Sequence, residues 1–268
     1  MTRNVDTIYP LTPLQRGMLH HSRLDPASGI YVEQFSCVLH GPLDLERFRG
    51  AWEAVVHRHD TLKTLFIRLH EENPLQVVRH TVGLPFEVID WRDHAADEQA
   101  DRFDRLLASD RARGFDFSVA PLMRVTLIDL GHERHRFLWT YHHAILDGWS
   151  MPLLLGEVFQ RYSRPDAPLP AIARDYRDYV AWLRTRNGDS SLDYWRDLLR
   201  GYRRPAGFAP SVCPSPANGA TSGADTRRTL SVRADTMPAG WMEAAGRACR
   251  VARVTLNTPC PGAWAMLL

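Results

Sequence analysis

The sequence predicts an α/β fold, and three observations support this class. Segments whose apolar residues recur every three or four positions alternate along the chain with short segments rich in β-branched and aromatic residues. Glycine and proline breaks separate these segments. Of the 268 residues, 44% are hydrophobic and 24% are charged, which is typical of a folded globular protein with a sizeable core.

The first half of the chain predicts three helices. Thr12, Pro13 and Gln15 have the order of a capping box, in which the threonine and glutamine side chains satisfy free backbone N–H groups at a helix start. The polar segment 95–113 predicts a helix that faces solvent along most of its surface. Segment 44–59 predicts the clearest amphipathic helix, because five apolar residues recur there at helical spacing: Leu45, Phe48, Trp52, Val55 and Val56.

Strands are predicted where short apolar segments end at turn residues. They cover residues 31–39, 62–69, 75–78, 86–89, 122–130 and 136–142. The glycine at Gly131 predicts a hairpin turn between the last two. The second strand of this hairpin leads directly into His142 and His143.

The second half of the chain predicts helices and long connections. Ser150 is expected to cap a helix over residues 151–162 that is apolar on most sides, and the helix is therefore expected to be buried. The proline-rich segment 163–172 predicts a connection. The remaining predictions are helices at 176–186 and 192–200, an exposed loop at 205–225, a strand at 229–233 and a capped helix start at Thr258.

Composition and charge exclude several classes of function. The 33 basic and 31 acidic side chains give a net charge of +2 and are interspersed, so no nucleic-acid partner is indicated. The chain contains no apolar run of about 18 residues and no secretory signal, so we expect no membrane contact and a cytoplasmic location. Four widely spaced cysteines without a CxxC pair indicate neither a disulfide framework nor a zinc site.

The segment YHHAILDGWS, from Tyr141 to Ser150, contains the best candidate for chemistry. Two histidines stand at a strand end, Asp147 follows the second by four residues, and Gly148 allows the backbone to turn. An imidazole with an ordinary pKa of about 6.5 can accept a proton near neutral pH. His143 is therefore a candidate general base.

Other interpretations of this segment are structural or metal-binding. The chain has twelve histidines, most of which must be surface or packing residues; His20, His21, His57 and His59 are expected to be structural. Adjacent side chains on a strand point to opposite faces, and no third ligand is nearby, so we expect no metal at His142 and His143. A serine hydrolase is also disfavoured, because no GxSxG motif is present.

Four segments in order resemble the core motifs of the condensation domains of nonribosomal peptide synthetases. They are YPLTPLQRGMLHHS at residues 9–22, HRHDTLKTLF at 57–66, YHHAILDGWS at 141–150 and YRDYVAWL at 176–183. The resemblance implies a chloramphenicol acetyltransferase-like fold, in which two α/β lobes with mixed sheets and flanking helices enclose the active site in a cleft.

The resemblance also implies the reaction and the partners. In this family of amide-forming acyltransferases of antibiotic biosynthesis, an acceptor α-amine attacks a donor thioester. Upstream and downstream peptidyl carrier proteins deliver both substrates on phosphopantetheine arms, next to an adenylation domain. No cofactor is expected to bind this chain directly. His143 would take the amine proton or orient the amine, and the sequence leaves both roles open.

Four further residues are expected to shape the site. By resemblance, Asp147 forms an ion pair with the second motif, where Lys63 replaces the usual arginine and lacks its two-pronged donor geometry. His142 is expected to face the interior and fix the loop. Gly148 would leave room for the substrate arm, and Trp149, beside it, is expected to pack.

The resemblance extends over nearly the whole chain but over only the first half of a condensation domain. It divides the chain into an N-terminal lobe, residues 1–170, and connecting helices with the start of an incomplete C-terminal lobe, residues 171–268. The chain alone is therefore expected to be inactive. Two alternatives stay open: a non-catalytic remnant or carrier-docking module, and an epimerisation domain.

Overall fold

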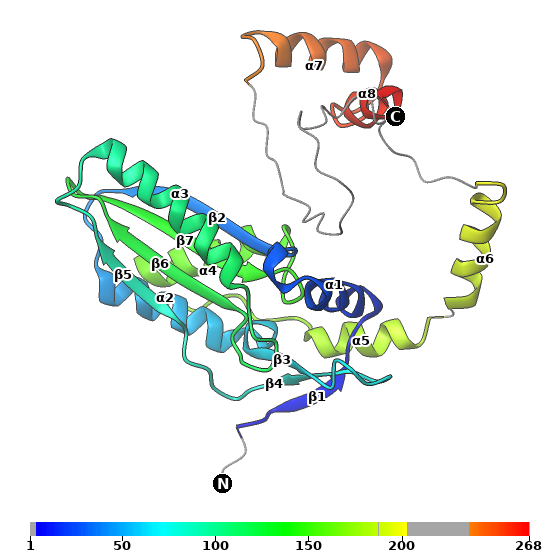
Figure 1. Ribbon diagram of the computed structural model, residues 1–268, viewed down its shortest axis with the longest axis horizontal. Coiled ribbons are helices and arrows are strands. Elements are labelled where there is room, and N and C mark those ends of the chain that lie inside the picture. Colours follow the sequence, from blue (N-terminus) through cyan, green and yellow to red (C-terminus); the bar gives the residue numbers. More distant parts are fainter. Residues whose placement is uncertain (1–3, 187, 203–235, 268) are drawn as a thin grey trace, which may run out of the picture. The chain divides into compact units, whose positions relative to one another are not determined.

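The computed structural model describes residues 4–186, 188–202 and 236–267. The chain divides into two compact units, Met1–Asn187 and Gly188–Leu268, which are treated separately below (Figure 1). The predicted boundary at residue 170 separates two lobes of a condensation domain rather than two compact units, and it stays a prediction. No helix among the described residues is long and apolar enough to cross a membrane.

A mixed four-stranded sheet forms the centre of the first unit (Figure 1). Its order is β2-β7-β6-β5, with antiparallel pairs except for the parallel pair β5 and β6. The strands are β2 (Val32–His40), β7 (Arg134–His142), β6 (Met123–Asp129) and β5 (Phe86–Asp90). Because β7 lies between two neighbours, His142 ends a strand that is hydrogen-bonded on both sides.

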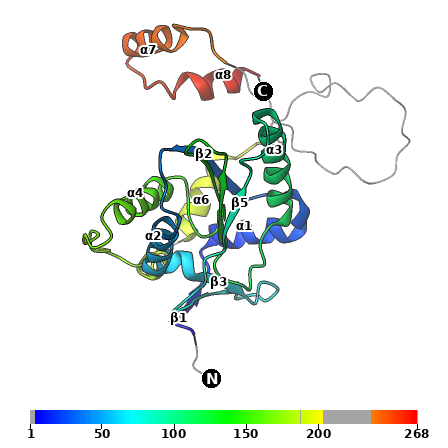
Figure 2. The ribbon, with the colours of Figure 1, turned by 90° about the vertical axis from the view of Figure 1, so that its left-hand side faces the viewer.

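Helices cover both faces of this sheet (Figure 2). Helices α2 (Leu45–Arg58) and α4 (Ser150–Ser163) lie on one face, and α3 (Ala96–Arg113) lies on the other. The main core lies between the sheet and α2, where the buried ring of Trp52 packs against Trp139 with 5.0 Å between ring centroids. Burial of these aromatic rings dominates the energetics of this layer.

A second, three-stranded sheet lies beside the first. Its order is β1-β4-β3, built from β1 (Thr7–Pro10), β4 (Leu75–Val78) and β3 (Thr64–Ile67), and both pairs are antiparallel. The predicted strand 62–69 is shorter in the structure, because its first two residues belong to the 3-10 helix η2 (Asp60–Lys63). Strand β1 was not predicted, because four residues ending in proline give no strand signal.

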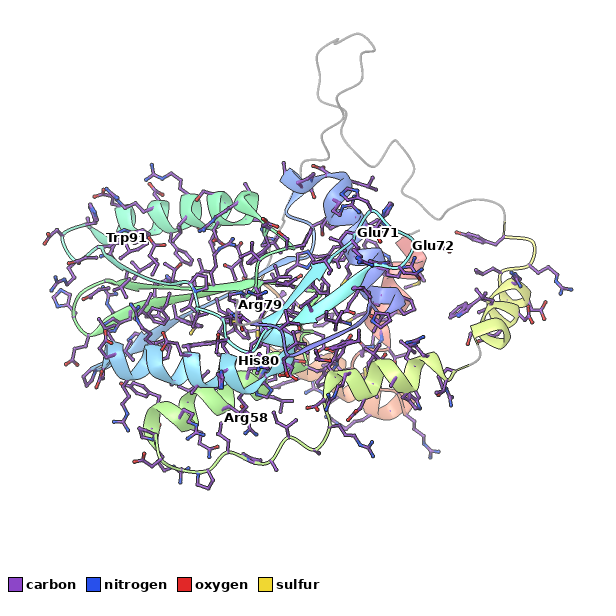
Figure 3. The ribbon with its side chains drawn as sticks, turned by 90° about the horizontal axis from the view of Figure 1, so that it is seen from below. Arg58, Glu71, Glu72, Arg79, His80 and Trp91 are labelled. Carbon is purple, nitrogen blue, oxygen red and sulfur yellow. The ribbon has the colours of Figure 1, made fainter. Side chains whose placement is uncertain are left out.

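Helix α1 (Pro13–Leu24) begins at the predicted capping box. The Gln15 backbone N–H donates to Thr12 Oγ1 over 3.2 Å, and the Thr12 N–H donates to Gln15 Oε1 over 3.0 Å. At the turn between β3 and β4, which Figure 3 marks by Glu71 and Glu72, Arg16 of α1 donates to the Glu72 carbonyl over 3.0 Å. This contact ties the exposed side of α1 to the second sheet.

The predicted buried helix at 151–162 needs correction. Helix α4 has one buried side, carrying Leu154 and Val158, while Leu153 is 72% exposed. Its N-cap residue is Trp149 and makes no side-chain cap, so the expected capping role of Ser150 is wrong. The predicted helix at 176–186 is present as α5 (Tyr176–Arg184) in the first unit.

The second unit consists of helices in its described part. These are α6 (Gly188–Leu198), α7 (Trp241–Ala252) and α8 (Pro259–Leu267). Helix α8 begins directly after Thr258, as the capping signal predicts. The predicted loop at 205–225 and strand at 229–233 lie outside the described residues.

Candidate active site

The histidine loop, residues 142–148, leaves the end of the central strand β7. The His142 N–H donates to the Leu122 carbonyl over 3.0 Å, and the His143 N–H donates to the Tyr31 carbonyl over 2.8 Å. These two bonds extend the pairing of β7 by one residue of each neighbouring strand, Leu122 before β6 and Tyr31 before β2. This pairing fixes the start of the loop on the sheet.

His142 is fully buried and neutral. The Ala144 N–H donates to its Nδ1 over 3.1 Å, so Nδ1 carries no proton and Nε2–H donates to Ser22 Oγ over 3.0 Å. Burial, with a smaller contribution from His143, lowers the pKa of His142 to about 4. This ring faces the interior, as expected, and it stays uncharged at neutral pH.

His143 is half-buried, and its tautomer is set by one hydrogen bond. Its Nδ1 lies 3.0 Å from the Leu146 carbonyl oxygen. A carbonyl only accepts, so Nδ1 must carry the proton and the neutral ring keeps a lone pair on Nε2. No described residue occupies Nε2 as a hydrogen-bond partner. His143 can therefore accept a proton or a hydrogen bond from a ligand.

A cavity of about 440 Å³ adjoins His143 within the first unit. Its walls come from the start of α1, the end of α2 with η2, the histidine loop, α4 and α5. Their apolar members are Leu14, Met18, Ala144, Ile145, Leu146, Leu153 and Leu154, and Tyr176 and Tyr179 add two rings. A largely apolar cavity with a few polar groups is the usual form of a small-molecule site.

Asp147 and Lys63 do not form the expected ion pair. Lys63 Nζ lies 3.0 Å from the carboxylate of Asp60, its neighbour in η2. Asp147 accepts from the Ser150 N–H over 2.9 Å and from the Ser150 hydroxyl over 2.8 Å. These bonds lower the pKa of Asp147. The predicted pair is wrong because each group has a closer partner three residues away in sequence.

Asp147 instead closes the histidine loop onto the start of α4. Gly148 has space on the side where a Cβ would stand, since no atom outside its chain neighbours lies within 4 Å. Its φ is not positive, so this backbone turn does not require glycine. Trp149 is 86% exposed, so its expected packing is absent from the described residues.

His59 shares the wall of this cavity with His143. Its Nε2 lies 2.7 Å from Glu157 of α4, and Glu157 also forms an ion pair with Arg58 at 3.2 Å. Figure 3 shows Arg58 at the end of α2, on the side that faces α4. These bonds hold α2 to α4, which agrees with the structural role expected for His59.

Three residues around the histidine loop were not predicted as part of the site. Gln15 donates to the Ala144 carbonyl over 3.1 Å, and Ser22 contacts His142. Tyr31 has a left-handed φ of 63° and presents its carbonyl to His143. Of the three, the sequence singled out only Gln15, as a member of the capping box. Its contact with Ala144 joins residues that are 129 positions apart, so no local pattern predicts it. The described residues contain no group of three metal-ligating side chains.

A family model described as "Condensation domain" matches residues 5–268. The chain is 38% identical over 265 residues to one component of the linear gramicidin synthase of Brevibacillus parabrevis, covering 97% of this chain and 3% of that protein. It is 30% identical over 274 residues to bacitracin synthase 1 of Bacillus licheniformis, covering 98% and 5%. The chain thus spans a small part of the curated relatives that it matches.

The fold is similar to that of solved condensation domains. The starter condensation domain of rhizomide synthetase gives a TM-score of 0.61 at 20% identity, covering 75% of this chain and 52% of that one. The first condensation domain of the CDA synthetase gives 0.62 at 23% identity, covering 74% and 50%. At these identities the likeness concerns the fold alone.

Proposed function

This chain belongs to the condensation-domain family of nonribosomal peptide synthetases, and from this premise we propose that it takes part in amide-bond formation between carrier-bound substrates. The observation that carries the proposal is that His143, whose Nε2 has no hydrogen-bond partner among the described residues, lines the cavity. The expected partners are upstream and downstream peptidyl carrier proteins and an adenylation domain. The cytoplasmic location stays a prediction.

In the proposed reaction, the acceptor's α-amine attacks the carbonyl carbon of the donor thioester. The new C–N bond forms as the amine loses a proton, and the C–S bond breaks to release the donor's thiolate, which takes up a proton and leaves as the thiol. A thiol has an ordinary pKa of about 8.5 and leaves readily, so the protein mainly has to position the reactants and accept one proton. His143 Nε2 either takes that proton or holds the amine by accepting its hydrogen bond.

The residues around His143 fit a site in which His143 alone accepts the proton. His142 stays neutral at pH 7 because burial lowers its pKa to about 4, so it does not compete for the proton. Asp147 is bonded to Ser150 rather than to either histidine, and we assign it to the shape of the loop. The phosphopantetheine arms belong to the carriers and enter as substrate, with the apolar wall and the open side of Gly148 offering them room.

The test joins residues 1–268 to the remaining condensation-domain sequence of a gramicidin synthase relative. Single-turnover dipeptide formation is measured by mass spectrometry on aminoacylated carrier proteins, for the parent and for His143→Ala. We expect the substitution to abolish product or slow its formation at least a hundredfold, because general base catalysis contributes roughly 10²–10⁴-fold. An unchanged rate in His143→Ala would remove the proposed role.

The same assay on residues 1–268 alone addresses the alternative of a remnant or carrier-docking module. We expect no product, because the resemblance places part of the cleft outside this chain. Carrier binding without product in both the short and the joined protein would favour the docking module. Racemisation of a carrier-bound residue without coupling would favour epimerisation.

A further inference from the structure

Helix α1 runs along the histidine loop and contacts it at two points. At its start, Gln15 donates to the Ala144 carbonyl over 3.1 Å. Two turns later, Ser22 bonds to His142 Nε2 over 3.0 Å. The residue between these contacts in the loop is His143. One rigid helix therefore holds the chain on both sides of the proposed base.

Gln15 is only 5% exposed, and its side-chain amide has one orientation that satisfies its partners. The Thr12 N–H donates to its Oε1, and the Ala144 carbonyl accepts from its Nε2. Rotating the amide by half a turn would place oxygen against carbonyl oxygen and NH₂ against N–H. Gln76 completes the network, with its amide 3.2 Å from that of Gln15 and 2.9 Å from the Pro10 carbonyl.

This network bears on His143 through the loop backbone. The Ala144 carbonyl that Gln15 holds directly follows His143, and Leu146, which fixes the His143 tautomer, comes two residues later. Without the Gln15 donor, the buried carbonyl of Ala144 loses its partner, and its peptide unit is free to rotate toward another one. Such a rotation would displace the Leu146 carbonyl from His143 Nδ1.

We propose that Gln15 is a positioning residue for His143: its side-chain amide fixes the Ala144 carbonyl and, through the loop, the orientation and tautomer of the imidazole. The effect on turnover rests on the proposed function, whereas the effect on the tautomer does not.

Three variants test the proposal. Gln15→Leu removes both hydrogen-bonding groups. Gln15→Glu keeps an oxygen acceptor for the capping box but donates to Ala144 only when its carboxyl is protonated, so the test does not depend on whether Gln15→Leu folds. The matched control is Gln99→Leu. Gln99 is a similarly buried glutamine of α3 that donates to the carbonyls of Trp91, His94 and Leu130, which line no part of the cavity.

The first measurement is ¹⁵N NMR of the histidine rings in residues 1–268, with His143→Ala identifying the signal. We expect His143 protonated on Nδ1 in the parent and in Gln99→Leu. In Gln15→Leu and in Gln15→Glu at pH 8 we expect a mixture of the two tautomers. A parent-like tautomer in both Gln15 variants would overturn the proposal.

The second measurement is turnover in the joined domain. We expect both Gln15 variants to lower kcat roughly tenfold or more at pH 8 with KM unchanged, because a small misplacement of a reacting group costs up to about a hundredfold. The ratio of Gln15→Glu to parent kcat should rise as the pH falls and the carboxyl gains its proton.

Two outcomes separate this inference from the proposed function. Equal loss of kcat in Gln99→Leu would reduce Gln15 to a general contributor to stability and overturn the proposal. If the parent forms no product but the tautomer changes as expected, the proposed function fails and the positioning role of Gln15 stands.

Discussion

Lowering the pH should destabilise the first unit through a single buried ring, His142. Folding lowers its pKa from an ordinary 6.5 to about 4, mainly because burial penalises the charged form. Between these two values the unfolded chain binds a proton that the folded chain does not. Stability from this group is therefore complete above pH 6.5 and is lost as the pH falls toward 4.

The magnitude follows from the difference between the two pKa values. At about 1.4 kcal/mol for each pKa unit, the loss reaches roughly 3 kcal/mol at pH 4. That is a large share of the roughly 5–15 kcal/mol that stabilises a typical domain. His142 is only 1% exposed, and its ring packs against Phe117 with 5.0 Å between centroids, so an imidazolium at this position would lose most of its hydration.

The assay is urea unfolding of residues 1–268, followed by tryptophan fluorescence at pH 7, 6, 5 and 4. His142→Gln removes the titrating ring, and His40→Gln, at an exposed position, controls for replacing a histidine. We expect the difference in unfolding free energy between parent and His142→Gln to shrink by about 3 kcal/mol from pH 7 to pH 4. A difference that is constant across this range would refute the burial-based reasoning.

Three further predictions follow. Asp147→Ala should lower the free energy of unfolding by about 1 kcal/mol, because the first N–H group of α4 loses its side-chain acceptor, while Asp147→Asn should lose less, as measured by thermal unfolding. Trp52→Ala should cost about 3–5 kcal/mol in urea unfolding, because it empties the centre of the main core. A double-mutant cycle between Lys63 and Asp60 should give a coupling of about 0.5 kcal/mol or more, and a cycle between Lys63 and Asp147 should give less than about 0.3 kcal/mol.

Much of the fold follows from local patterns in the sequence. The apolar spacing over 44–59 predicts a helix that the structure has at Leu45–Arg58, and the capping box locates the start of α1. Periodicity and capping act within a few residues, so they are visible in the sequence. Strand β1 is not predicted from the sequence, because its four residues form a strand only by pairing with β4, more than 60 residues away.

The candidate site was predictable in part. The motif identified His142 and His143, and the strand prediction placed them at the end of β7. The predicted ion pair of Lys63 with Asp147 was wrong, because η2 brings Asp60 within reach of Lys63. No spacing rule in the sequence decides between these two carboxylates. The contact of Gln15 with Ala144 depends on how α1 packs on the loop, which the sequence does not encode locally.

The hydrogen bond from His143 Nδ1 to the Leu146 carbonyl has a consequence for the rate of the proposed reaction. In water, an imidazole that gains a proton becomes a cation, and solvent dipoles must turn toward the new charge. Here one dipole already points at the ring before any substrate arrives. The carbonyl oxygen can stabilise the imidazolium as it forms without having to move, which is electrostatic preorganisation. A loop built to hold one tautomer would thereby also lower the reorganisation energy of the proton transfer.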